Sequence, residues 1–184
     1  MKDKNVLVVG MARSGIAAAK LLSERGAHVR ISDIKTKDQF TDGLRELERP
    51  GIEWRLGEKS ETLLDGMDLL VISPGVPIDK PVVIKAKEMG IPVIGELELA
   101  YRMSQGSVVA ITGTNGKTTT TTLMGEIFKN MGKRTFVVGN IGYPYSAVAA
   151  ETRPDDVVVA EVSSFQLETI DTFHPTISAI LNIT

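Results

Sequence analysis

The part of the sequence that decides the fold reads Val108-Val109-Ala110-Ile111-Thr112-Gly113-Thr114-Asn115-Gly116-Lys117-Thr118. Its first four residues form a short, continuous apolar run, as expected for a strand that is buried on both faces. A glycine-containing loop follows. The next stretch has apolar side chains at helical spacing, which we expect on one buried face: Leu123, Met124, Ile127, Phe128 and Met131. The sequence therefore predicts a strand, a loop and a helix in direct succession.

The loop in this unit has the residues that bind phosphate groups. Backbone N–H groups, glycines and a helix N-terminus together form an anion site. Lys117 would neutralise the β- and γ-phosphates of a nucleotide, and the Thr118 hydroxyl would bind Mg²⁺. The common phosphate loop has a glycine five positions before Gly116, but Ile111 stands there, so we expect a shorter variant of the loop. An ordinary turn with a solvated lysine is the alternative interpretation.

Polar residues follow two further apolar strands of this half of the chain. Asn140 comes after the strand predicted at 135–138, and Glu161 closes the strand predicted at 157–160. An acidic residue at such a strand end is typical of Mg²⁺ binding in nucleotide hydrolases, although it can also simply reach solvent. Asn140 equally fits a turn. Because the carboxyl ends of parallel strands line the ligand crevice of an open α/β sheet, the sequence predicts that both residues converge on the phosphate loop.

The rest of the chain alternates between strand and helix patterns. Further strands are expected at 6–9, 29–31, 69–72, 92–94 and 177–183, with helices at 15–25, 81–89 and 96–102. This alternation is typical of parallel sheets. We therefore predict an α/β fold in two units, a Rossmann-like parallel-sheet domain in residues 1–95 and the first part of a P-loop-type α/β ATP-binding domain in residues 96–184.

A second glycine turn, Gly10-Met11-Ala12-Arg13-Ser14-Gly15, lies between the first strand and the first helix. It matches the dinucleotide-binding fingerprint except that its second glycine is Ala12, and Asp33 ends the following strand where a ribose contact is expected. The changed glycine favours a general nucleotide-diphosphate site over an NAD site. A purely structural tight turn is the alternative.

Composition excludes several classes of protein. The chain has 184 residues, with 21 basic and 23 acidic side chains, a net charge of −2 and no cysteine. A nucleic-acid partner is not expected because no basic field exists, and disulfides and thiolate metal sites are excluded. No apolar run is long enough to cross a bilayer. We expect a cytoplasmic protein without membrane insertion, and we expect a monomer.

Several motifs together resemble those of a known family. They are Gly113–Thr119, Gly139-Asn140-Ile141-Gly142, the stretch from Glu161 to Glu168, Ser73-Pro74-Gly75-Val76-Pro77, and the Gly10–Gly15 turn. They are similar to motifs of the Mur ligases, which build the peptide stem of bacterial peptidoglycan. The similarity is strongest to the members that add D-glutamate to UDP-N-acetylmuramoyl-L-alanine.

This resemblance implies an ATP- and Mg²⁺-dependent ligase that forms an amide bond through an acyl phosphate. It implies catalytic roles for Lys117, Asn140 and Glu161, with Thr118 and Glu161 as metal ligands. The implied ATP-binding residues are Gly113, Thr114, Asn115, Gly116, Lys117, Thr118 and Thr119. The implied UDP-sugar-binding residues are Arg13, Ser14, Gly15, Asp33, Ile34, Lys35, Gly75, Asn140 and Ser163.

The chain departs from the family pattern after Thr184. Family members continue with further metal-binding residues and a third domain, so we expect these 184 residues alone to be inactive. Two alternatives stay open at this point. One is another Mur ligase or a folylpolyglutamate synthase, although the Ser163-Ser164-Phe165-Gln166 stretch argues against it. The other is a non-catalytic, Rossmann-like nucleotide-binding module.

Overall fold

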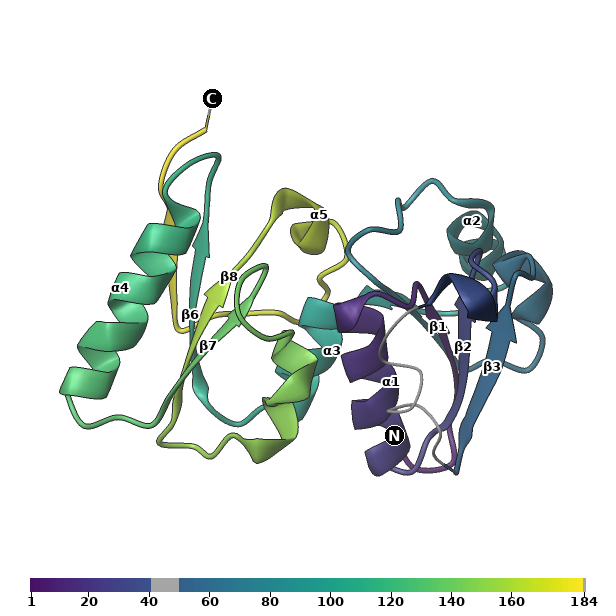
Figure 1. The fold of residues 1–184 in the computed structure, drawn as a ribbon, viewed down its shortest axis with the longest axis horizontal. Coiled ribbons are helices and arrows are strands. Elements are labelled where there is room, and N and C mark those ends of the chain that lie inside the picture. The colour runs from purple at the N-terminus through teal and green to yellow at the C-terminus, as the bar shows by residue number, and fades with distance from the viewer. Residues whose placement is uncertain (41–49, 184) are drawn as a thin grey trace.

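The computed structural model describes residues 1–40 and 50–183, which form two parallel sheets lying side by side (Figure 1). Within these residues the first sheet has the strand order β3-β2-β1-β4-β5, and the second has the order β7-β8-β6-β9. The bounds of the strands are Asn5–Val9 (β1), His28–Asp33 (β2), Ile52–Leu56 (β3), Leu69–Ile72 (β4), Val93–Gly95 (β5), Ser107–Thr112 (β6), Thr135–Gly139 (β7), Val157–Glu161 (β8) and Ile177–Ile180 (β9). The predicted α/β fold with parallel sheets is confirmed.

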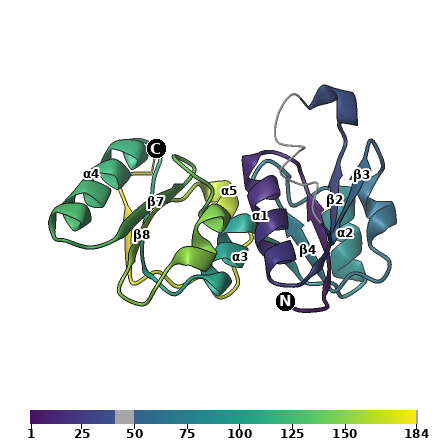
Figure 2. The ribbon, with the colours of Figure 1, turned by 60° about the horizontal axis from the view of Figure 1, so that its bottom comes forward.

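Helices lie at the two ends of the molecule and between the sheets. In Figures 1 and 2, α4 lies at the end formed by the second sheet, α2 at the opposite end, and α1 and α3 where the sheets meet. Within the described ranges, none of the helices is both long and apolar enough to cross a membrane. The bounds are Arg13–Glu24 (α1), Pro81–Glu88 (α2), Glu96–Met103 (α3), Lys117–Asn130 (α4) and Ser164–Leu167 (α5).

The central strands are buried because apolar side chains pack against both faces of the sheet. In β1, Val8 pairs with Ile31 of β2 and with Val71 of β4, and all three side chains are at most 1% exposed. Strands of this kind need apolar residues on both faces. The continuous apolar runs in the sequence therefore located them correctly.

The two sheets share an apolar core where they meet. Helix α1 contacts both α3 and the short turn Tyr145–Ala147. One cluster of buried apolar side chains includes Val8 of β1, Tyr145, and Val158 of β8. The first sheet is thereby packed directly against elements of the second, which fixes the strand ends of the two sheets relative to each other.

Two buried carboxylates anchor α3 at this junction. Glu98 accepts hydrogen bonds from the backbone N–H groups of residues 171–173, from the Thr172 hydroxyl and from Arg102. Burial alone would raise the pKa of Glu98, but these donors outweigh it and lower the pKa to about 2. Glu96 accepts one bond from the Ser146 N–H at 2.6 Å, and its pKa is raised because burial dominates.

Three expectations differ from the structure. The edge strand β3 was not predicted as a strand, and Trp54 within it packs against the core. The strand predicted at 177–183 ends at Ile180. The predicted apolar face of α4 is wrong for three of its five residues, because Leu123, Ile127 and Met131 are exposed.

Small residues replace these three on the buried face of α4. Thr121 and Gly125 are its buried residues, and an added Cβ at Gly125 would lie 2.4 Å from Cγ2 of Val137. Met124 and Phe128 are partly buried against the same sheet. The helix therefore approaches the sheet so closely at Gly125 that a larger side chain does not fit.

Candidate functional site

The phosphate-type loop connects β6 to α4. Gly113 and Gly116 have φ angles of 137° and 83°, a backbone conformation that side chains other than glycine rarely adopt. The Lys117 Nζ donates hydrogen bonds to the carbonyl oxygens of Gly113 at 2.6 Å and Thr114 at 3.0 Å. The loop thus curls around the lysine ammonium group, at the positive end of the α4 dipole.

Glu161 lies at the centre of the predicted cluster. Its Oε2 accepts a hydrogen bond from the Thr118 hydroxyl at 2.9 Å, and its Oε1 accepts one from Nδ2 of Asn140 at 3.0 Å. The carboxylate side chain is largely enclosed, since Glu161 is 2% exposed. Because β6, β8 and β7 are adjacent and parallel, their carboxyl ends bring these three side chains together, as the sequence predicted.

Gly139 allows β7 and β8 to meet closely beside this cluster. Its φ is +104°, and an added Cβ would lie only 2.2 Å from the carbonyl oxygen of Glu161. That same carbonyl accepts a hydrogen bond from the backbone N–H of Asn140 at 3.0 Å. The position of Asn140 relative to Glu161 therefore depends on the absence of a side chain at residue 139.

Hydrogen bonds to Asp33 hold the turn after β1 in place. The Asp33 carboxylate accepts hydrogen bonds from the backbone N–H of Met11 at 2.7 Å and of Lys35 at 2.9 Å. Gly15 lies beneath the turn, where an added Cβ would be 1.8 Å from the Gly10 carbonyl oxygen. The Ser73 hydroxyl donates to that carbonyl at 2.9 Å. The end of β2 and the segment after β4 together brace the turn.

A cavity of about 920 Å³ lies where the strand ends of the two sheets face each other. The Arg13 guanidinium at its edge donates a hydrogen bond to the carbonyl of Gly142, which connects the two sides. Six of the nine predicted sugar-nucleotide residues line this cavity: Arg13, Ser14, Asp33, Ile34, Gly75 and Asn140. Gly15, Lys35 and Ser163 are not among its lining residues, and all nine assignments stay predictions.

Other residues that line this cavity were not anticipated. They include Gln166 and the segment Gly57–Glu61, which follows β3. Gln166 is 5% exposed and accepts hydrogen bonds at Oε1 from the backbone N–H and hydroxyl of Ser163, so these two residues form the N-terminal cap of α5. Recognising the alternating pattern of β3 as a strand would have pointed to the loop that follows it.

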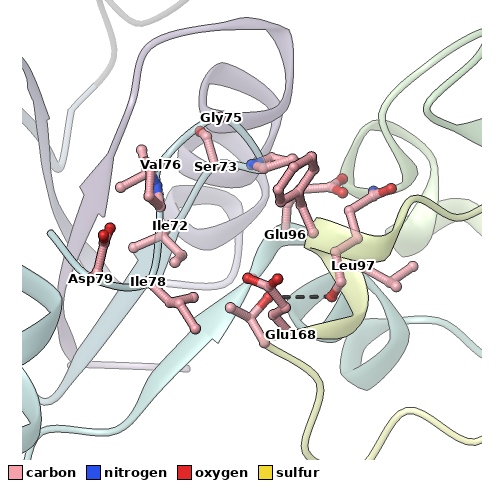
Figure 3. A pocket seen from close by; sticks show the side chains of 15 residues that line it. Ile72, Ser73, Gly75, Val76, Ile78, Asp79, Glu96, Leu97 and Glu168 are labelled. Carbon is pink, nitrogen blue, oxygen red and sulfur yellow. Dashed lines mark hydrogen bonds between the residues drawn. The ribbon is translucent and has the colours of Figure 1, made fainter.

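A smaller cavity of about 440 Å³ lies between the segment after β4 and α5. Figure 3 shows Ile72, Val76 and Ile78 on one side of it and Glu96, Leu97 and Glu168 on the other. Ser73 and Gly75 border both cavities. The loop after β4 therefore separates the two spaces.

Comparison with known protein families gives a clear assignment. Residues 4–95 match the family model "Mur ligase MurD-like, N-terminal domain", and residues 111–184 match "Mur ligase middle domain". The chain belongs to the Mur ligase family. The resemblance found in the sequence motifs is confirmed.

Individual Mur ligases match along the whole chain. The UDP-N-acetylmuramoylalanine–D-glutamate ligase of Alkaliphilus oremlandii is 52% identical and that of Caldanaerobacter subterraneus subsp. tengcongensis is 49% identical, each over 100% of the chain. The chain spans 41% of the length of each of these relatives.

Solved structures of Mur ligases share the fold. The Neisseria meningitides UDP-N-acetylmuramate:L-alanyl-gamma-D-glutamyl-meso-diaminopimelate ligase matches 99% of the chain, and 61% of its own, with a TM-score of 0.60 at 19% identity. The Thermotoga maritima UDP-N-acetylmuramate-alanine ligase MurC matches 98% of the chain, and 41% of its own, with a TM-score of 0.56 at 24% identity. The two parallel sheets are thus an arrangement found in other Mur ligases.

Proposed function

We propose that the full-length protein is an ATP-dependent ligase that joins D-glutamate to UDP-N-acetylmuramoyl-L-alanine in peptidoglycan precursor synthesis. The observation that carries the proposal is the 52% and 49% identity to ligases of that name along the whole chain. Residues 1–95 would bind the UDP-sugar part of the substrate. Residues 96–184 would form part of the ATP-binding domain, and Thr184 lies outside the described residues.

The loop between β6 and α4 is the proposed site of the ATP phosphates. The first N–H groups of α4 have no partner within the helix, and they lie at the positive end of its dipole. Lys117 is already positioned by the Gly113 and Thr114 carbonyls, so its ammonium group can neutralise phosphate charge without a large rearrangement. Catalysis of phosphoryl transfer depends mainly on such positioning and charge neutralisation.

The Thr118 and Glu161 side chains fit a Mg²⁺ ion bound together with ATP. Mg²⁺ prefers an octahedron of oxygen ligands at about 2.1 Å, in which neighbouring oxygens are about 3 Å apart. Oγ1 of Thr118 and Oε2 of Glu161 are 2.9 Å apart. Asn140 holds the other carboxylate oxygen and so orients the proposed ligand. When bound, the ion would supply charge stabilisation for the transferring phosphoryl group.

The cavity between the sheets is the proposed site of the UDP-sugar substrate. Its volume, about 920 Å³, falls within the range of small-molecule sites. Arg13 provides a positive charge at its edge, and Ile34, which is 86% exposed, offers an apolar surface for a base. Asn140 and Gly139 border both this cavity and the Glu161 cluster. A substrate in the cavity would therefore extend toward the ATP phosphates.

The proposed reaction has two steps. The terminal carboxylate oxygen of UDP-N-acetylmuramoyl-L-alanine attacks the γ-phosphorus of ATP, which breaks the bond to the β-phosphate oxygen and releases ADP. The amine nitrogen of D-glutamate then attacks the resulting acyl carbon, loses its proton, and expels phosphate. Lys117 and the start of α4 would stabilise the negative charge that moves in the first step.

The test is a ligation assay on the full-length protein. We expect ADP release and a product of the expected mass with ATP, Mg²⁺, D-glutamate and UDP-N-acetylmuramoyl-L-alanine. Lys117→Met should lower kcat by roughly 100- to 1,000-fold, as removal of one charge-stabilising group does elsewhere. Lys129→Met is the matched control, because Lys129 lies exposed on the same helix and pairs with Glu126.

Two results would contradict the proposal. One is ligation of L-alanine to UDP-N-acetylmuramate instead of D-glutamate to UDP-N-acetylmuramoyl-L-alanine, which would indicate a different Mur ligase. The other is binding of NAD in preference to the UDP-sugar in calorimetric titrations, which would indicate a nucleotide-binding module of another kind.

A further inference from the structure

The chain after β9 makes a dense set of hydrogen bonds with the phosphate-type loop. The side chain of Asn182 accepts a bond from the backbone N–H of Asn115 at 2.9 Å and donates one to the Asn115 carbonyl at 3.0 Å. The backbone carbonyl of Asn182 accepts a third bond from the N–H of Thr114 at 3.1 Å. Two consecutive loop residues are thus bound by one residue that is 67 positions from Asn115.

The loop packs closely against the segment that follows β9. The Leu181 N–H donates to the Thr112 carbonyl at 3.0 Å, which continues the pairing of β9 with β6 past the end of the strand. At Gly113, an added Cβ would lie 3.1 Å from both the N and O atoms of Asn182. Gly113 is therefore required both for its φ of 137° and for the approach of Asn182.

Asn182 and Lys117 bind different backbone groups of the loop. Lys117 binds the carbonyl oxygens of Gly113 and Thr114, whereas Asn182 binds the N–H groups of Thr114 and Asn115. The N–H groups of Thr114 and Asn115 are therefore engaged by protein. The amides left for an anion are those toward the start of α4, and their direction depends on how the preceding loop is fixed.

We propose that Asn182 is a positioning residue of the phosphate loop, whose side-chain amide pairs with Asn115 and thereby sets the direction of the N–H groups that bind ATP. This inference rests on the proposed function of the loop. A primary amide suits this role because it presents a donor and an acceptor side by side, matching the C=O and N–H of one residue. Hydrogen bonds from a residue outside the loop also suit a phosphate loop that is shorter than the common form.

The experiment compares Asn182→Ala and Asn182→Leu with the wild type in the full-length protein. Leucine keeps a similar volume but has no polar group, so it separates packing from hydrogen bonding. We expect both variants to raise the Kd of ATP about tenfold in calorimetry, as the loss of two ordinary hydrogen bonds would. The KM of the UDP-sugar substrate should stay within twofold, because Asn182 is not among the residues that line its cavity.

Hydrogen exchange supplies a second readout at single residues. In Asn182→Ala the Asn115 amide should exchange at least tenfold faster, while the Thr114 amide keeps its backbone acceptor and its protection. Asn130→Ala is the matched control, because the Asn130 side chain donates a hydrogen bond to the Glu126 carbonyl one turn earlier in α4. Its ATP affinity and loop exchange should equal those of the wild type.

Three outcomes would overturn the inference. An Asn182→Leu variant with wild-type ATP affinity would show that volume alone matters. Equal losses in ATP affinity, UDP-sugar KM and melting temperature in both Asn182 variants would show a general structural role. Unchanged exchange at Asn115 in Asn182→Ala would remove the proposed contact. If the wild type itself does not bind ATP, the proposed function fails as well, and that result is seen without any variant.

Discussion

Replacing Gly139 with alanine is expected to disable the site while leaving the protein folded. The added Cβ would lie 2.2 Å from the Glu161 carbonyl oxygen, and side chains essentially never approach closer than 3.0 Å. The ends of β7 and β8 must therefore separate by about 0.8 Å, which displaces both Asn140 and Glu161. A misplacement of about 1 Å in a catalytic site can lower the rate roughly 100-fold.

The matched control is Gly132→Ala, because Gly132 has a similar backbone conformation in open space. Its φ is +77°, and among the described residues no heavy atom apart from Gly132 and its two chain neighbours lies within 4 Å of an added Cβ. Both substitutions force alanine into the left-handed region at a cost of about 1–2 kcal/mol, which corresponds to a decrease of roughly 2–8 °C in melting temperature. Only Gly139→Ala has the additional clash at the site.

The assay is the ligation rate of the full-length protein at saturating substrate concentrations, together with thermal melting. We expect kcat to fall about 100-fold in Gly139→Ala and to stay within twofold in Gly132→Ala. A Gly139→Ala protein that melts like the control and retains at least a third of the wild-type kcat would refute the reasoning. The spacing of β7 and β8 would then be unimportant for the chemistry.

Three further predictions concern stability, measured as free energies of unfolding in urea. The pKa of Glu98 is lowered to about 2. Its ionised carboxylate therefore contributes about 3 kcal/mol of stability above pH 4.5, and this contribution is lost as the pH falls toward 2. Glu98→Gln should lower the free energy of unfolding at pH 7 and weaken its dependence on acid pH. Glu96 has a raised pKa, so the sign is opposite: Glu96→Gln should stabilise the protein at pH 8 and make no difference below pH 4. Gly125→Ala should destabilise by about 1–3 kcal/mol through its clash with Val137, despite the better helix propensity of alanine; a more stable variant would contradict the close packing of α4.

Much of the fold follows from the sequence because buried parallel strands have an unambiguous pattern. Strands β1, β4 and β8 are continuous apolar runs with every residue but Asn5 of β1 buried. The edge strand β3 was missed because its residues are only partly buried and include charged side chains. The face of α4 was misassigned because a close helix–sheet approach selects small residues at Thr121 and Gly125, and such residues carry no apolar signal.

The site was partly predictable for a related reason. Thr118, Asn140 and Glu161 each follow an apolar strand, and parallel strands bring their carboxyl ends to one edge. Asn182 could not be found in this way, because its role depends on the side-by-side pairing of β9 with β6 and on the exact reach of one amide. Gln166 was missed because the sequence does not show that a residue in the N-terminal cap of α5 also lines the cavity.

The pairing of β6 with strands that follow it in the chain has a consequence for biosynthesis. Both neighbours of β6 in the sheet, β8 and β9, leave the ribosome after it. Asn115 meets Asn182 only when 67 more residues have been made, which takes about 3–13 s at 5–20 residues per second. A nascent chain would therefore carry the whole glycine-containing loop for several seconds before the Asn182 side chain that pairs with Asn115 has been made.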